Sequence, residues 1–99
     1  MLRHVVSWKL IAEDSTTKRA DIDTITAALE SLPGKIPQIL SLRIGSNIAF
    51  PDTNWDLVLI ADYNDVAGLE AYQVHPEHVA VTKVIRPLVA SRSNVDFLV

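Results

Sequence analysis

Side chains with proton-transfer chemistry fall in two places along the chain. Tyr72, His75 and His78 lie close together in the segment Y-Q-V-H-P-E-H, and His4 lies near the start. A histidine with an ordinary pKa of about 6.5 exchanges protons at neutral pH, and a tyrosine hydroxyl can donate a hydrogen bond to a carbonyl oxygen. With His78 as base and Tyr72 as the carbonyl partner, the group could remove a proton next to a carbonyl if His4 converges on the same place.

Each histidine also has a structural explanation. His75 could cap the helix that Pro76 begins, and His4 on an apolar strand could be a hydrogen-bonded core residue. The spacing of His75 and His78 lacks the i, i+4 geometry of a helical zinc motif, and no third ligand is fixed beside them. The glycines are too far apart for a phosphate loop. We therefore expect neither a metal nor another cofactor.

The hydrophobic pattern divides the chain into strands, where apolar residues alternate, and helices, where they recur every three or four residues. Asp14 or Ser15 is expected to cap the first helix, Asp65 to cap the second, and Gly34 to close the first. The expected elements are a strand over 2–11, a helix over 15–32, strands over 38–48 and 55–63, a helix over 65–73 that breaks at His75 and restarts at Pro76, and a last strand over 94–99.

This order of elements is the split β-α-β repeat of ferredoxin-like α+β domains, in which helices cover one face of a four-stranded antiparallel sheet. His4 shares the predicted helix-facing side with apolar residues that would form the walls of a ligand pocket, namely Val6, Trp8 and Leu59. Val5, Val58 and Ile60 would lie on the open face. An exposed apolar patch of this kind is typically covered, and a second copy packed sheet against sheet is the simplest cover.

Composition limits the classes of function. The 99 residues are 48% hydrophobic and 21% charged, which predicts one folded domain over 1–99. The net charge of −3, without a basic cluster, argues against nucleic acid and anionic lipid as partners. The chain has no cysteine, and its apolar runs are too short to cross a bilayer. Without any targeting signal, we expect a cytoplasmic protein.

The sequence resembles the stress-responsive dimeric α/β-barrel (Dabb) family. The resemblance rests on the opening L-R-H-V-V-S-W-K-L, on L-P-G-K-I-P-Q-I-L-S-L, on N-W-D-L-V-L-I-A-D-Y and above all on L-E-A-Y-Q-V-H-P-E-H-V-A-V. It covers almost the whole chain and implies a ferredoxin-like subunit whose dimer closes two sheets into a barrel.

Most members of that family have no assigned reaction, while a few cyclise poly-β-keto thioesters between sheet and helices. The resemblance maps the polar residues of those cyclases onto His4, Tyr72 and His78. The chain departs from the pattern at Leu57, where many relatives carry a histidine, and in the first helix, which offers Ile22, Thr26 and Leu29 instead of larger rings.

Three functions therefore stay open. The first is a homodimer that binds a small apolar or carbonyl-containing ligand, with Val6, Trp8, Leu59 and His75 as binding residues. The second is a cofactor-independent cyclase-like or isomerase-like enzyme with His78, Tyr72 and His4 as catalytic residues. The third is oxidative chemistry, for which the chain supplies no further motif. The ligand, the pathway and any assembly beyond the dimer are not encoded in a recognisable pattern.

Overall fold

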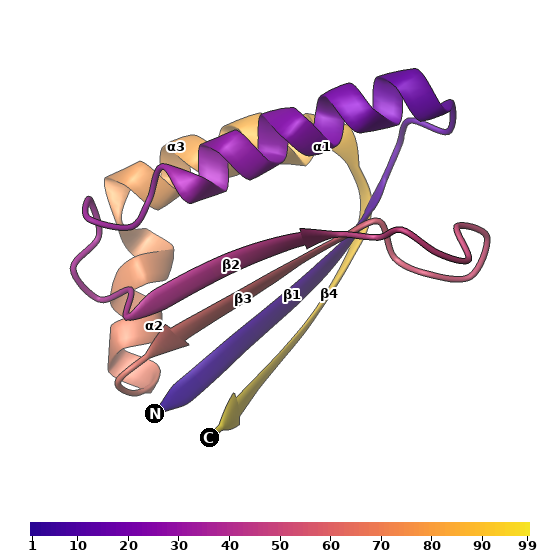
Figure 1. The fold of residues 1–99 in the computed structure, drawn as a ribbon. Coiled ribbons are helices and arrows are strands. Elements are labelled where there is room, and N and C mark those ends of the chain that lie inside the picture. Colours follow the sequence, from indigo (N-terminus) through magenta and orange to yellow (C-terminus); the bar gives the residue numbers. More distant parts are fainter.

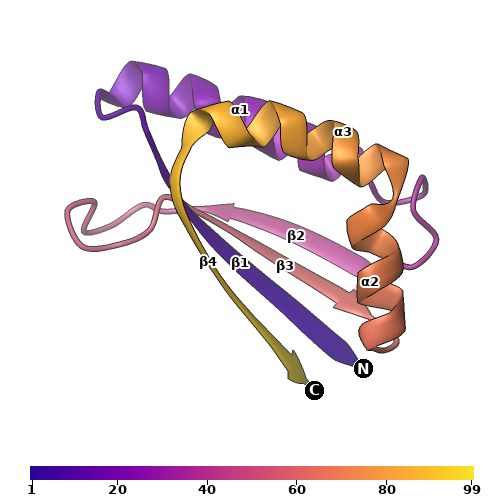
Figure 2. The ribbon, with the colours of Figure 1, turned by 180° about the vertical axis from the view of Figure 1, so that it is seen from behind.

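The computed structural model describes residues 1–99. Three α-helices lie on one side of a four-stranded antiparallel sheet (Figures 1 and 2). No helix combines the length and the apolar character that crossing a membrane requires. In chain order the elements are β1 (Leu2–Leu10), α1 (Ser15–Glu30), β2 (Ser41–Ser46), β3 (Leu57–Tyr63), α2 (Val66–Val74), α3 (Pro76–Ile85), the short 3₁₀ helix η1 (Arg86–Leu88) and β4 (Val89–Leu98).

The sheet has the order β2-β3-β1-β4, which confirms the predicted ferredoxin-like fold. Helices α1 and α3 run side by side across one face, while α2 turns down at one end of the sheet to join β3 to α3 (Figure 2). Strand β1 pairs on both sides, with β3 and with β4. A side chain on β1 therefore reaches the helix-covered space from the middle of the sheet.

Strand β1 buries every second residue against the helices, because its apolar residues follow the period of two of an extended chain. This side of β1 carries Leu2, His4, Val6, Trp8 and Leu10, all of them buried. Helix α1 packs Ile22, Ile25 and Leu29 against it at the three- and four-residue spacing of an amphipathic helix. The layer between the sheet and the helices therefore forms the core.

The predicted helix starts are confirmed, whereas α1 ends at Glu30 with Ser31 as its C-cap, two residues before the predicted end, so Gly34 does not close it. The side chain of Asp14 accepts a hydrogen bond from the Thr17 N–H at 2.8 Å, and Asp65 accepts from the Gly68 N–H at 2.9 Å. After α1, Gly34 adopts a left-handed φ of +88°, which glycine reaches without a clash of a Cβ atom. These local contacts start both helices and turn the chain toward β2.

The strand limits differ from the predicted ones. Strand β4 begins at Val89, earlier than predicted, because residues 89–93 pair with β1 although their side chains are mostly exposed. Strand β2 is shorter than predicted, since the chain is still turning at Ile39, whose N–H donates to the Ile36 carbonyl at 3.2 Å. Strand β3 begins at Leu57, two positions later than predicted.

The open face of the sheet carries the apolar residues predicted for it. Val5 lies opposite Ile60 on β3 and opposite Val95 on β4, so the three form one row across the sheet. The same face holds Val58 and Phe97, and no helix covers it (Figure 1). Ile60, Val95 and Phe97 are 37%, 62% and 42% exposed, which leaves a substantial apolar surface.

Candidate functional site

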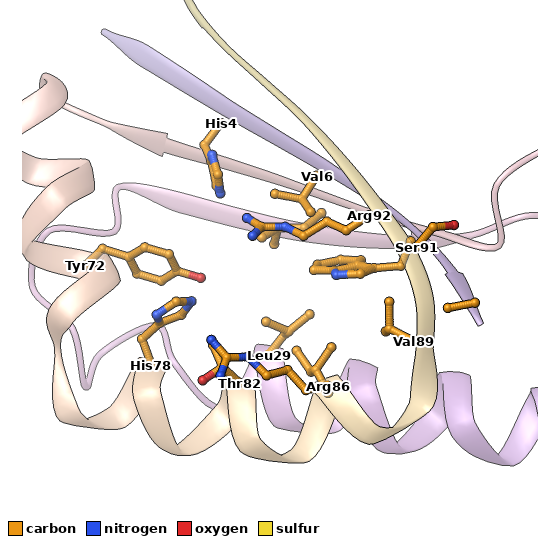
Figure 3. A pocket seen from close by; sticks show the side chains of 14 residues that line it. His4, Val6, Leu29, Tyr72, His78, Thr82, Arg86, Val89, Ser91 and Arg92 are labelled. Atoms are coloured by element: carbon orange, nitrogen blue, oxygen red, sulfur yellow. The ribbon is translucent and has the colours of Figure 1, made fainter. Parts of the chain in front are cut away.

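A cavity of about 360 Å³ lies between the sheet and the helices (Figure 3). This volume is in the range of roughly 300–1,000 Å³ typical of small-molecule sites. The cavity is lined by His4, Val6, Trp8, Leu29, Leu59, Tyr72, His78, Thr82, Ile85, Arg86, Val89, Ala90, Ser91 and Arg92.

The walls of the cavity are largely apolar. Val6, Trp8 and Leu59 line it from the sheet, as predicted, and Leu29 lines it from α1. Trp8 is 6% exposed and forms a wall without filling the space. Of the three α1 residues singled out in the sequence, Leu29 alone reaches the cavity. Leu57 is buried in the core and does not line it.

His78 lies in the first turn of α3, and its ring lies beside that of Tyr72 at one end of the cavity (Figure 3). Its Nδ1 lies 3.0 Å from the backbone carbonyl of Gln73. Because a carbonyl only accepts, Nδ1 carries the proton and Nε2 keeps a free lone pair. Burial lowers the pKa of His78, and the charge of Arg92 lowers it further. The ring is therefore neutral, and able to accept a proton, at pH 7.

Tyr72 lies near the end of α2 and is 1% exposed. Its ring centroid is 4.2 Å from that of His78 and 5.1 Å from that of Tyr63. Burial raises the pKa of Tyr72 to about 12, so its hydroxyl keeps its proton at neutral pH. The hydroxyl points into the cavity and can donate a hydrogen bond to a bound oxygen (Figure 3).

His4 points into the cavity from β1, and its Nδ1 contacts the carboxylate of Asp96 on β4. An ionised carboxylate only accepts, so Nδ1 carries the proton and Nε2 remains free toward the cavity. The sequence-based prediction missed Asp96. The only signal for it is the pairing of β1 with β4, which places Asp96 opposite His4.

His75 is the predicted binding residue that does not line the cavity. Its Nδ1 accepts a hydrogen bond from the Glu77 N–H at 3.1 Å and caps α3, whose first residue is Pro76. The Y-Q-V-H-P-E-H segment thus combines two roles. Tyr72 and His78 face the cavity, while His75 and Pro76 set the angle between the helices that carry them.

Arg86 and Arg92 reach the cavity from η1 and β4, and the sequence-based prediction missed both (Figure 3). Arg92 lies opposite Trp8 across the β1–β4 pairing, so the correct start of β4 would have placed it on this side of the sheet. No group of three or more His, Cys, Asp or Glu side chains is arranged to hold a metal ion. The polar residues that line the cavity are thus two histidines, a tyrosine, two arginines, Thr82 and Ser91.

Comparisons with known proteins agree with the fold and with the resemblance of the sequence. A dimeric protein of unknown function and ferredoxin-like fold from Bacteroides fragilis is 29% identical, with a TM-score of 0.89 over 99% of this chain and 95% of that one. A dimeric ferredoxin-like protein of unknown function from Thermobifida fusca is 28% identical, with a TM-score of 0.83 over 99% and 90%.

The hydroxynitrile lyase from Passiflora edulis shares the fold at 16% identity, with a TM-score of 0.80 over 99% of this chain and 92% of that one. Among proteins with curated descriptions, none matches this sequence. The family model of the stress responsive A/B barrel domain matches residues 2–99. The chain therefore belongs to the stress responsive A/B barrel domain (Dabb) family.

Proposed function

We propose that this protein binds a small, mostly apolar, carbonyl-containing molecule in the cavity between its sheet and its helices. The observation that carries the proposal is the cavity itself, of about 360 Å³, with a polar end formed by His4, Tyr72 and His78. Apolar walls exclude water from most of a ligand, and the few polar groups fix its orientation. The Tyr72 hydroxyl is the donor best placed for a carbonyl oxygen.

Tryptophan fluorescence can test the binding directly. Trp8 lines the cavity, while Trp55 lies outside it and is 42% exposed, so Trp55→Phe leaves one tryptophan that reports on the cavity. We expect 2-octanone to change the Trp8 signal with saturation, and His78→Ala to weaken that response. The proposal fails if 2-octanone gives no saturable change.

The matched control for His78→Ala is His75→Asn, since His75 lies outside the cavity and Asn also caps helices. Equal losses in both variants would argue against a binding role for His78. Circular dichroism establishes that each variant is folded. If His78→Ala unfolds the protein, His78→Gln replaces it as the test, because Gln keeps a polar side chain that can donate to the Gln73 carbonyl.

A second candidate function is proton transfer next to a carbonyl, as in an isomerase or a cyclase of the polyketide type. The specific observation in its favour is the free Nε2 of His78 beside the protonated hydroxyl of Tyr72. In this reaction His78 Nε2 takes the proton from the α-carbon, the C–H electron pair forms an enolate, and the Tyr72 hydroxyl donates a hydrogen bond to the enolate oxygen.

Exchange of α-protons for deuterium tests this second function without a known substrate. With 2-octanone in D₂O, we expect the protein to accelerate loss of the α-proton signals in proton NMR spectra. Tyr72→Phe should slow the exchange by about 10²-fold, the size typical of one lost oxyanion donor, and His78→Gln should abolish the acceleration. If 2-octanone binds but its α-protons exchange no faster than in buffer, the protein does not catalyse proton transfer on this ketone. The proposed binding function is unaffected by that result.

We further propose that the protein is a homodimer that buries the open face of the sheet. The support is the exposed row of Val5, Ile60 and Val95, together with the dimeric state of the relatives from Bacteroides fragilis and Thermobifida fusca. Two sheets packed on such faces would close a barrel. We propose a cytoplasmic location and no nucleic-acid or membrane partner, which cell fractionation and binding assays would test.

A further inference from the structure

Apart from the two histidines, Arg86 and Arg92 are the only basic residues that line the cavity. Neither side chain has a partner within the chain. No ion pair and no side-chain hydrogen bond within the chain engages either guanidinium. Both side chains extend toward the cavity from opposite sides, one from the end of α3 and one from β4 (Figure 3). An arginine without an acidic partner is available to a bound anion.

The surroundings of these arginines strengthen their field. A neighbouring hollow of about 320 Å³ shares His4, His78, Thr82, Arg86 and Arg92 with the cavity and adds Lys83 at its rim. No aspartate or glutamate lines either space. The whole chain nevertheless carries a net charge of −3. Positive charge is thus concentrated in these two adjoining spaces, and charge of one sign in a cleft attracts the opposite sign.

We propose that the ligand of this cavity is an amphiphilic monocarboxylate, whose carboxylate binds between Arg86 and Arg92 and whose apolar part contacts Trp8 and Leu29. This inference rests on the proposed binding function and specifies its ligand class.

Carboxylate is the anion that fits the groups present. The planar guanidinium of arginine matches the two oxygens of a carboxylate. Phosphate sites typically use backbone N–H groups of a glycine-rich loop or of a helix N-terminus, and no glycine lines the cavity. A carboxylate between the arginines also leaves the adjacent carbon atoms of the ligand at the polar end, where the rings of Tyr72 and His78 are in contact.

The test compares three probes of equal chain length in the Trp55→Phe protein, namely octanoate, 2-octanone and octyl phosphate. We expect octanoate to bind roughly tenfold more tightly than 2-octanone, since hydrogen bonds to charged groups are stronger than neutral ones. Higher salt should weaken octanoate binding and have little effect on 2-octanone. Octyl phosphate should bind no more tightly than octanoate.

Variants locate the anion. Arg86→Gln and Arg92→Gln should each weaken octanoate binding by roughly tenfold and affect 2-octanone much less. The matched control is Arg19→Gln, because Arg19 lies on α1, outside both spaces, in an exposed pair with Asp23. It removes the same charge without removing a cavity group.

Each outcome separates the inference from the function on which it rests. If 2-octanone binds and octanoate binds no more tightly, the carboxylate inference is wrong and the binding function stands. Tighter binding of octyl phosphate, or an equal effect of Arg19→Gln, also overturns the inference. If none of the probes changes the Trp8 signal, the binding function itself fails.

Discussion

Asp96 determines how the buried ring of His4 is held. The two side chains meet across the β1–β4 pairing, and the His4 side chain is 3% exposed. Without Asp96 the Nδ1–H of His4 would lose its acceptor in a largely dry space. The orientation of His4 toward the cavity therefore depends on a residue of another strand.

We expect Asp96→Ala to lower the free energy of unfolding by about 1–2 kcal/mol, the cost of leaving a buried donor unsatisfied. Urea denaturation measures the change. Asp23→Ala is the control, because Asp23 pairs with Arg19 on the exposed side of α1, where such pairs contribute less than about 0.5 kcal/mol. Equal effects of the two substitutions would contradict the role assigned to Asp96.

His78 should titrate below the ordinary histidine range. Its pKa is lowered by burial and then by the charge of Arg92, with His4 adding in the same direction and the Gln73 carbonyl opposing it. NMR titration of the His78 ring should therefore give a pKa below about 6.5. Because Arg92 faces the ring, Arg92→Gln should raise that pKa, whereas Arg19→Gln on α1 should leave it unchanged.

The lowered pKa of His78 makes the stability of the folded protein depend on pH. A lowered pKa means that the folded protein binds this proton less tightly than the unfolded chain does. The contribution of neutral His78 to stability is therefore complete above about pH 6.5 and is lost as the pH falls through the lowered pKa. Tyr72, whose ring contacts that of His78, keeps its proton throughout this range.

At the scale of elements, the boundary between α2 and α3 holds the rings of Tyr72 and His78 in contact. The His75 side chain caps α3, and Pro76 occupies its first position, where a missing N–H costs nothing. We expect His75→Ala to cost about 0.5–2 kcal/mol of stability, as loss of a helix cap typically does, with little change in ligand affinity for the folded protein. Thermal and urea denaturation measure the first effect, and Trp8 fluorescence measures the second.

His75→Asn should restore the stability, because Asn caps as well as any residue. His75→Ala could instead remove ligand binding while the fold stays intact. The prediction of His75 as a binding residue would then be right, and capping of α3 alone would not explain its role.

The sequence predicts most of this architecture, because its strong signals are local. The alternation of β1 and the His75-Pro76 break are visible in short segments and suffice to place His4, Tyr72 and His78 on one side. The start of β4 and Arg92 were missed because residues 90–93 are small or polar and exposed, so their pairing with β1 leaves no hydrophobic period to detect. Asp96 lies within the predicted last strand, but its partner His4 follows only from the pairing of that strand with β1. Arg86 lies in η1, which no local pattern predicts.

At the scale of the whole molecule, the open sheet face should determine the oligomeric state. Ile60 lies in the middle of that face, beside Arg43 and Val5 on neighbouring strands. A glutamate there can contact Arg43 in the monomer and would be buried without water in a dimer. Ile60→Glu should therefore give a light-scattering mass near 10.9 kDa, while the unchanged protein gives about twice the 10.9 kDa of one chain.

Val74→Glu is the matched control, because Val74 is 77% exposed on α2, away from the open face. It should leave the mass of the unchanged protein intact. A mass near 10.9 kDa for the unchanged protein at micromolar concentration would disprove the dimer. The paired charges of Arg3 and Asp62 on the same face, joined by two hydrogen bonds, are compatible with burial between subunits.

The pairing of the first strand with the last has a consequence for biosynthesis. His4 and Asp96 are 92 positions apart, and β4 supplies Arg92 as well as one side of the cavity. A ribosome releases the chain from its N-terminus, so His4, Tyr72 and His78 emerge before the strand that completes their surroundings. A nascent chain stalled before residue 89 would bind no ligand, and ligand capture would therefore report that synthesis of this domain had finished.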